Sequence, residues 1–388
     1  MGIEVANNTR TNGSEFDFSQ LGYIAAIFAA ANTNADLRTP IKPCISAAPD
    51  SEKMIIGPFE LDKKVGTGTI CRVFKIEPHA ELGVHIPEAD VKSGLVIKLA
   101  KNNELKKEDH KKWLRHILFR EGRIHARIQG SRYTSEILDY GEIQGRSFII
   151  ERLIYGRNLR RANELGIYPQ PKEAISILIQ VLEALEVPHK QGVVHRDIKT
   201  DNILLDSKNK HIRLIDWGSA YHPEEVVSAN PNLETPSDPK KRVHIKDDFK
   251  KMAALRFMAP EQLDLESEST PAMDIYSAFA TAFYLITSGK SIHPGNTDEE
   301  VKASILDPSL RSREIEGVQQ NWEMIPRRYQ AIFTKGLTSD ASKRFKSARK
   351  AAKILRKILG DDPDEIVKNC IIRMSKEYRE KLVEESAE

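Results

Sequence analysis

A polar stretch set between apolar runs, just before and after residue 200, constrains the fold more than any other feature of the sequence. Residues 194–205 read VHRDIKTDNILL, and residues 212–218 read IRLIDWG. Asn202 follows Asp197 by five positions, and Asp216 stands at the end of the next strand-like run. Carboxylate and amide oxygens of this kind orient hydroxyl groups and bind Mg²⁺. The stretch therefore predicts a polar site suited to both tasks.

A glycine-containing segment lies earlier in the chain, between two predicted strands. Residues 65–73 read VGTGTICRV, with glycines at positions 66 and 68. Glycines at this spacing let the backbone approach a phosphate closely. By itself the segment is weak support for a phosphate site, because a glycine-rich hairpin is more often a simple turn.

A lysine and a glutamate further along are expected to pair. Lys98 closes an apolar strand, where a lysine either reaches solvent or binds an anion. Glu121 lies on the apolar stripe of a helix predicted over residues 113–128. A carboxylate on a buried face is costly without a cationic partner, and Lys98 is the natural candidate.

Together with Met258-Ala259-Pro260-Glu261, these features resemble the motifs of eukaryotic-like protein kinases with a Ser/Thr-type catalytic loop. The resemblance covers roughly residues 59–359. It implies an α+β, bilobal fold with a small β-rich N-lobe and a larger helical C-lobe. It also implies an enzyme that transfers the γ-phosphoryl group of ATP to Ser or Thr hydroxyls of proteins and that phosphorylates itself, with ATP and Mg²⁺ as cofactors.

The resemblance assigns catalytic roles residue by residue. Asp197 would accept the proton of the acceptor hydroxyl or orient it, and Lys199 would neutralise the transferring group. Lys98, paired with Glu121, would bind the α and β phosphates. The implied metal ligands are Asn202 and Asp216.

A nucleotide-binding set follows in the same way. It comprises Val65, Gly66, Thr67, Gly68, Thr69, Val73, Val96, Lys98, Glu151, Leu153 and Leu204. Val73, Val96 and Leu204 would enclose the adenine, and the backbone between Glu151 and Ile154 would serve as the hinge. The spacing from Glu151 to Gly156 is one residue longer than is usual in the family.

Other matches concern the fold, and some positions depart from the family pattern. Glu261 and Arg344 match a structural ion pair, and Asp274 matches an aspartate that braces the catalytic loop. The departures are Cys71 in place of a third glycine, Trp217 in place of a phenylalanine, Pro188, which interrupts the helix before the catalytic loop, and Ala254 in place of a threonine. None removes a charged catalytic group. Cys71 is either a tolerated substitution or a redox-sensing thiol, and Ala254 leaves a tyrosine or dual-specificity acceptor open.

Two alternatives belong to other functional classes. An ATP-binding pseudokinase scaffold would keep the fold without catalysis, although all five polar catalytic positions are intact. A small-molecule kinase would share the catalytic loop but lack the Ala-Pro-Glu segment and the partner of Arg344. Both of these are present.

The chain divides into three parts. Residues 1–56 are expected to be a loosely ordered extension, 57–358 the kinase domain (N-lobe 57–153, C-lobe 154–358), and 359–388 an amphipathic helix. Further helices are predicted over residues 174–189, 271–288, 328–337 and 345–359. The apolar stripe of the last helix either docks on the large lobe or forms a partner or dimer contact.

Composition limits the compartment and the partners. There are 59 basic and 56 acidic residues, and this near balance does not favour a nucleic-acid partner. Three dispersed cysteines suit a reducing, cytoplasmic setting. The apolar run at 21–31 lacks a basic flank and is too short to span a membrane, so neither export nor membrane contact is expected.

The segment from Asp216 to Glu261 is expected to contain an inserted loop. In relatives with an arginine before the catalytic aspartate, here Arg196, a phosphorylated residue in this segment pairs with that arginine. The later part of the segment, residues 239–258, has no Ser, Thr or Tyr. One hypothesis is therefore that Asp247 or Asp248 pairs permanently with Arg196. The alternatives are that both aspartates are solvated, or that Ser228, Thr235 or Ser237 is the switch.

Overall fold

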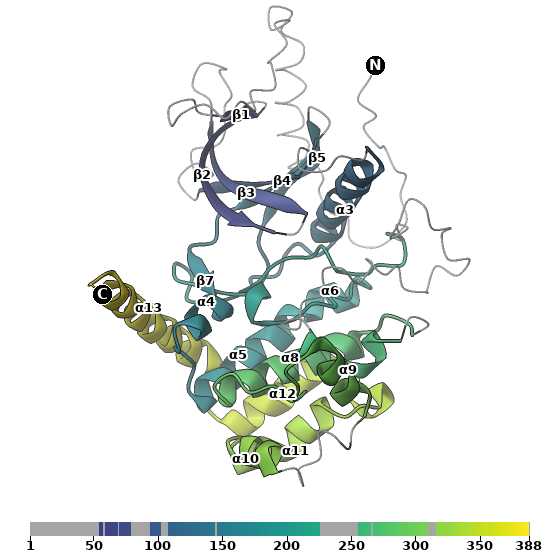
Figure 1. The fold of residues 1–388 in the computed structure, drawn as a ribbon, viewed down its shortest axis with the longest axis vertical. Coiled ribbons are helices and arrows are strands. Elements are labelled where there is room, and N and C mark those ends of the chain that lie inside the picture. The colour runs from purple at the N-terminus through teal and green to yellow at the C-terminus, as the bar shows by residue number, and fades with distance from the viewer. Residues whose placement is uncertain are drawn as a thin grey trace, which may run out of the picture.

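An antiparallel sheet forms the upper part of the molecule in Figure 1. The computed structural model describes residues 54–56, 59–68, 70–78, 94–101, 108–143, 146–225, 255–264, 267–307, 309 and 316–387. Within them the strands are β1 (Met54–Ile56), β2 (Phe59–Thr67), β3 (Cys71–Pro78), β4 (Leu95–Ala100), β5 (Ile137–Ile143) and β6 (Arg146–Arg152), in the order β1-β2-β3-β4-β6-β5. Strand β1 pairs with β2, so the sheet begins ahead of the predicted domain start at residue 57. The rest of the expected extension, with the apolar run at 21–31, lies outside the described residues.

Successive side chains of β4 point to opposite faces of the sheet, and the two faces have different surroundings. Leu95, Ile97 and Leu99 pack on one side in a cluster with residues of β2, β3 and β6. The other side is covered by helix α3 (Glu108–Arg127), which packs against β5 and β6. Because successive side chains of a strand point to opposite faces, Lys98 lies on the side of α3.

The larger region below the sheet is mostly helical (Figure 1). Its helices are α4 (Leu159–Glu164), α5 (Pro171–Ala184), α6 (Glu186–Lys190), α8 (Pro271–Ile286), α9 (Asp298–Leu306), α10 (Glu316–Glu323), α11 (Arg327–Gly336), α12 (Ala348–Leu359) and α13 (Pro363–Ala387), with short 3-10 turns η2 (Thr200–Asn202), η4 (Pro260–Gln262) and η6 (Ala341–Lys343). Helices α5 and α8 lie in the middle of the largest apolar core. A second sheet consists of β7 (Gly156–Asn158), β8 (Ile203–Asp206) and β9 (His211–Leu214). The polar stretch leads from α6 into β8. The predicted α+β order, a small β-rich region followed by a larger helical one, is confirmed.

The helix predicted over residues 174–189 is interrupted in the structure. Helix α5 ends at Ala184, and α6 starts at Glu186. Pro188 has no backbone N–H to donate to the carbonyl of Ala184, and its ring crowds that carbonyl, so the helical ladder breaks at this point. The interruption redirects the chain into the polar stretch.

The amphipathic helix α13 docks on the helical region through its first half. Val367, Ile371 and Met374 are buried in the main core, against α5. Arg373 is hydrogen-bonded to Glu173 at the start of α5, and near the outer end Leu382 is 37% exposed. None of the described helices is both long enough and apolar enough to cross a membrane.

Candidate active site

In the loop before β8, the ammonium group of Lys199 contacts both carboxylate oxygens of Asp197. The Lys199 Nζ lies 2.9 Å from Oδ1 and 2.7 Å from Oδ2 of Asp197. Asn202 donates from Nδ2 to the backbone oxygen of Asp197 at 2.8 Å and to its Oδ2 at 3.0 Å. The amide nitrogen of Asn202 is thereby committed to Asp197, which leaves the Oδ1 atom as its possible metal ligand.

The electrostatics of this loop suit a proton acceptor. Burial raises the pKa of Asp197 above its ordinary value, Lys199 opposes the rise, and the charge of Asp216 adds to it. A carboxylate with a raised pKa accepts a proton more readily from a hydroxyl group. The loop can therefore orient and deprotonate a hydroxyl placed beside Asp197.

The side chain of Asp274, near the start of α8, accepts hydrogen bonds from the backbone of this loop. Its Oδ2 accepts the N–H of His195 at 2.8 Å, and its Oδ1 accepts the N–H of Arg196 at 2.7 Å. The His189 Nε2 lies 2.9 Å from the same Oδ2. Asp274 is fully buried. The predicted brace is therefore confirmed, and it acts on the two residues directly before Asp197.

Asp216 follows β9 and is brought beside the catalytic loop by strand pairing. Ile203 pairs with Leu214 in the β8–β9 ladder, and the N–H of Ile215 donates to the backbone oxygen of Asn202 at 3.0 Å. Asn202 and Asp216, the two predicted metal ligands, thus flank one end of the same hairpin.

Gly218 lies where Asp216 approaches α3. A Cβ at position 218 would lie 3.2 Å from both Asp216 Oδ1 and Glu121 Oε2, so a side chain there would crowd two carboxylates. Trp217 is fully buried, with its ring 4.5 Å from that of His195. The tryptophan that departs from the family pattern is accommodated by packing on the catalytic loop.

Lys98 and Glu121 form the predicted ion pair. The Lys98 Nζ lies 2.8 Å from Glu121 Oε1, and their side chains are 13% and 3% exposed. Burial alone would lower the pKa of Lys98, but the neighbouring carboxylates of Glu121 and Glu151 outweigh it and raise that pKa well above its ordinary value. The ammonium group is therefore charged and able to bind an anion.

The glycine segment is the β2–β3 hairpin above Lys98. Gly66 is paired with Val73, and the N–H of Gly68 donates to the backbone oxygen of Cys71 at 2.9 Å. A Cβ at either glycine would meet other atoms of the chain only at ordinary contact distances, 3.7 Å or more. Packing within the chain does not require these glycines, which is compatible with their predicted role beside a phosphate group. Thr69 lies outside the described residues.

Burial answers the question about Cys71. The side chain is buried, and this burial raises the pKa of its thiol to about 12. The thiolate is the reactive form of cysteine. The structure therefore favours the tolerated substitution over a redox-sensing thiol.

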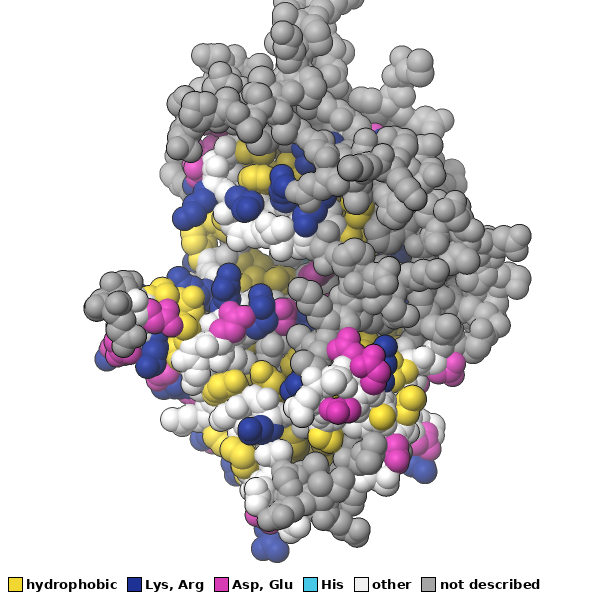
Figure 2. Space-filling view, viewed as in Figure 1, with side chains coloured by type: hydrophobic (Ala, Val, Ile, Leu, Met, Phe, Trp, Pro, Cys, Tyr) yellow, Lys and Arg dark blue, Asp and Glu magenta, His cyan; other side chains and the backbone are white. Residues whose placement is uncertain are grey.

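The candidate nucleotide residues that the structure describes lie on or next to β2, β3, β4, β6 and β8. Val96 is buried, Val73 and Leu204 are half-buried, and Val65 is 48% exposed at the hairpin. In the space-filling view this face is hollowed, with apolar side chains at its base and Lys and Arg side chains beside it (Figure 2).

Backbone hydrogen bonds define the hinge register. The N–H of Arg152 donates to Glu136 O and that of Leu153 to Gly94 O, both at 3.0 Å. Ile154 then offers the first N–H after β6 that no group of the described residues engages. The Glu151 side chain does not point along the hinge, because it contacts Lys98 at 3.0 Å.

The residues present fit ATP and a magnesium ion. Lys98 and the open hairpin suit phosphates, and Asn202 with Asp216 supplies the oxygen ligands that Mg²⁺ prefers, with phosphate oxygens completing its shell. Bound there, the ion would neutralise charge on the phosphates. Among the described residues no cluster of three His, Cys, Asp or Glu side chains forms a metal site complete in itself.

A link between α3 and the segment after Trp217 was not predicted from the sequence. The Glu225 carboxylate is buried and lies 3.0 Å from Arg123 and 3.3 Å from Arg127. Arg120 donates to the backbone oxygens of Ala220 and Glu225. The helical spacing of the three arginines indicates a basic face of α3, but nothing in the sequence pattern identifies Glu225 as its partner. Asp247, Asp248 and Ala254 lie outside the described residues, and Arg196 donates from Nε to Ser219 O at 2.7 Å.

The predicted structural ion pair also forms. Arg344 donates to both carboxylate oxygens of Glu261, at 2.6 and 2.8 Å, and its side chain is fully buried. The pair joins the segment after the catalytic region to the turn before α12.

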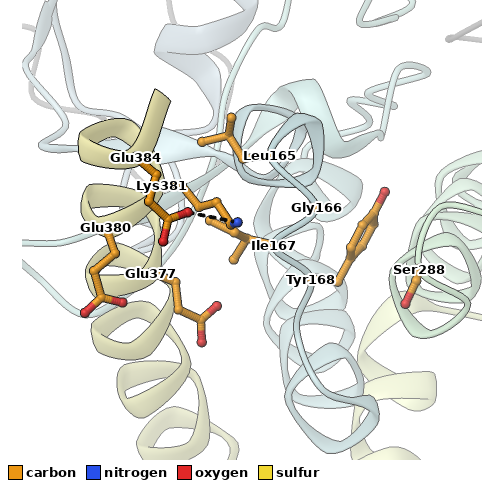
Figure 3. Close-up of a pocket in the computed structure, with 9 residues that line it drawn as sticks. All are labelled: Leu165, Gly166, Ile167, Tyr168, Ser288, Glu377, Glu380, Lys381 and Glu384. Carbon is orange, nitrogen blue, oxygen red and sulfur yellow. Dashed lines mark hydrogen bonds and ion pairs between the residues drawn. The ribbon is translucent and has the colours of Figure 1, made fainter. Parts of the chain in front are cut away.

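A cavity of about 510 Å³ lies apart from these groups, between the outer end of α13 and the loop after α4 (Figure 3). Glu377 and Glu380 of α13 line one side, and Ile167 and Tyr168 line the other. Lys381 is ion-paired with Glu384 at 3.1 Å. The acidic side is thus partly neutralised within the helix.

A β-rich region over a helical one, with a lysine–glutamate pair, a braced Asp-Lys-Asn loop and a second aspartate, is the arrangement of the protein-kinase fold. Residues 59–364 match the family model described as the protein kinase domain, and the chain belongs to this family. It is 26% identical over 325 residues to the serine/threonine-protein kinase PknH of Mycobacterium bovis, which covers 83% of this chain and 47% of that protein. It is also 26% identical to PknE of M. bovis (74% of this chain, 44% of the relative) and to PknD of M. tuberculosis (55% and 28%). The chain spans less than half the length of these relatives.

Proposed function

We propose that this protein is an active kinase that transfers the γ-phosphoryl group of ATP, with Mg²⁺ held by Asn202 and Asp216, to Ser or Thr hydroxyls of proteins, including its own. The observation that carries the proposal is the ion pair between Lys199 and both oxygens of Asp197. A lysine two positions after the catalytic aspartate is the choice of Ser/Thr kinases, and the relatives carry that name. Protein substrates are the expected partners.

The pseudokinase alternative would require a missing or displaced catalytic group. Lys98 and Glu121 are paired, and Asp197 and Asn202 are joined by hydrogen bonds. Asp216 is within reach of the same loop through the β8–β9 hairpin. This arrangement supports catalysis over a scaffold role.

The test is autophosphorylation of the purified chain with ATP, with and without Mg²⁺, followed by phosphoamino-acid analysis. We expect Mg²⁺-dependent phosphoserine or phosphothreonine, and a loss on the order of 10²-fold or more in Asp197→Ala, because the base and aligned charges supply most of the catalysis. Asp361→Asn, at an exposed ion pair with Lys172, serves as the control. ATP binding without turnover would establish the scaffold alternative, and phosphotyrosine would establish dual or tyrosine specificity.

A further inference from the structure

Lys98 has a second carboxylate partner that comes from the sheet. In the β4–β6 ladder Glu151 is paired with Val96, two residues before Lys98. Residues two positions apart on a strand share a face, so Glu151 and Lys98 lie on the same face of the sheet. Diagonal neighbours on one face of a sheet are within reach of long side chains. The Glu151 carboxylate is 6% exposed and lies 3.0 Å from the Lys98 Nζ. Lys98 is therefore held both by Glu121 of α3 and by Glu151 of β6.

Glu151 in turn contacts a buried histidine on α3. His125 lies one helical turn beyond Glu121 and is fully buried. Its Nδ1 is 3.1 Å from Glu151 Oε1, and its Nε2 is 2.9 Å from the backbone oxygen of Ser135. The Ser135 hydroxyl also lies 3.3 Å from Nε2, so the ring links the Glu151 carboxylate to Ser135.

The surroundings of Glu151 favour its ionised form. Burial would raise the pKa of Glu151, but Lys98 and His125 outweigh it and hold that pKa well below its ordinary range. Lys98 thus lies between two carboxylates, Glu121 and Glu151, and His125 contacts the second of them. The Lys98 ammonium gives each of these buried carboxylates an opposite charge.

We propose that Glu151 is a positioning residue for phosphoryl transfer, which aims the Lys98 ammonium from the sheet and, through His125, fastens α3 one turn beyond the Lys98–Glu121 pair. The proposal rests on the kinase activity proposed above. Helix α3 is then tied to the sheet at two points, Glu121–Lys98 and His125–Glu151. Two ties one turn apart oppose both translation and rotation of the helix, whereas a single ion pair acts as a pivot.

Separate measurements of kcat and KM distinguish a positioning role of Glu151 from a role in stability alone. Glu151→Gln keeps the size of the side chain and removes its charge, so Lys98 loses an aiming contact but keeps its own charge. We expect kcat to fall about tenfold, since small misplacement of a charged group is costly in the transition state. The KM for ATP should not rise, because the ammonium is less neutralised in the variant.

The experiment compares wild type, Glu151→Gln, Glu121→Gln and the double variant, with Glu142→Gln as control. Glu142 lies on β5, is 52% exposed and stands 3.8 Å from Arg115. Because either carboxylate can hold Lys98 when the other is lost, the double variant should lose more than the product of the two single losses. A kcat of Glu151→Gln equal to that of the control, or strictly multiplicative losses, would overturn the proposal.

A second measurement does not depend on catalysis. Amide hydrogen exchange in α3 should be faster in Glu151→Gln than in wild type and unchanged in Glu142→Gln, since the second tie is lost. If wild type shows no phosphoryl transfer, the proposed function fails while this measurement still judges the tie. If Glu151→Gln does not fold, His125→Gln is measured in its place, and unchanged exchange in α3 there would equally refute the tie.

Discussion

Replacement of Asp274 by asparagine tests how the catalytic loop is held. In the wild type, Oδ2 of Asp274 accepts the His195 N–H and contacts the His189 ring, and Oδ1 accepts the Arg196 N–H. An asparagine has one acceptor oxygen, which will take the position with two donors. The buried N–H of Arg196 is then left facing an NH₂ group.

The magnitude follows from that single unsatisfied donor. A buried N–H without an acceptor costs about 1–3 kcal/mol. At roughly 2 °C per kcal/mol for a chain of this size, Tm should fall by about 2–6 °C. Arg196 also adopts φ 64°, an unfavourable conformation for a residue with a side chain, and the lost hydrogen bond is one that holds it there.

The effect on activity should exceed the effect on stability. Arg196 directly precedes Asp197, so relaxation of its backbone moves the catalytic carboxylate, and a displacement near 1 Å can cost about 10²-fold in rate. The assay is kcat for autophosphorylation beside Tm from thermal unfolding, with Asp361→Asn as the matched exposed control. A variant with wild-type kcat and Tm would refute the reasoning.

The pH dependence gives a third check on Asp274. Burial would raise its pKa, but the hydrogen bond from His189 and the backbone donors outweigh this and place the pKa below the ordinary 3.8. A lowered pKa contributes stability that is complete above the ordinary value and disappears as the pH falls through the folded-state value. The stability difference between wild type and Asp274→Asn should therefore narrow below about pH 4. A difference that stays constant into that range would contradict the assignment.

Three further predictions concern other parts of the molecule. Truncation after Asp362 should lower Tm sharply, because each large buried side chain of α13 contributes about 1.5–3 kcal/mol; an unchanged Tm with an altered mass in light scattering would indicate a partner contact instead. Native Cys71 should react slowly with an alkylating reagent, since burial raises its pKa to about 12, and labelling as fast as in denaturant would contradict this. Glu225→Gln should lower kcat by weakening the contact of Arg123 on α3 with the segment after Trp217, while Glu224→Gln, at a side chain 69% exposed, should not; equal activity of the two variants would show that Glu225 has no such role.

Local patterns were enough for much of the site. Asp197 and Asn202 stand five positions apart in one loop, so a polar site could be predicted from the chain, whereas the contacts of Asp197 with Lys199 and Asn202 came from the structure. The pairing of Lys98 with Glu121 was also predictable, because a carboxylate on an apolar helical stripe needs a cation. The interruption of the helix over 174–189 by Pro188 was also predictable, because proline lacks the backbone donor that a helix needs.

The contacts of Glu151 and Glu225 could not be predicted from the sequence. Glu151 follows an apolar strand and was assigned to the hinge, since the sequence does not say which residue of β4 faces it. Register decides this, because a shift of one residue moves every side chain to the other face of the sheet. Glu225 meets Arg123 across about a hundred positions of chain, a pairing that only the docking of α3 creates.

The sequence by itself determined the class of fold, the catalytic loop and the cation–carboxylate pair, because each depends on residues close in the chain or on the cost of burying a charge. The tertiary structure decided which groups share Lys98, which donors hold the loop and where α13 rests. These depend on strand register and helix docking, where many weak apolar contacts fix the geometry and the polar groups must then find partners within it.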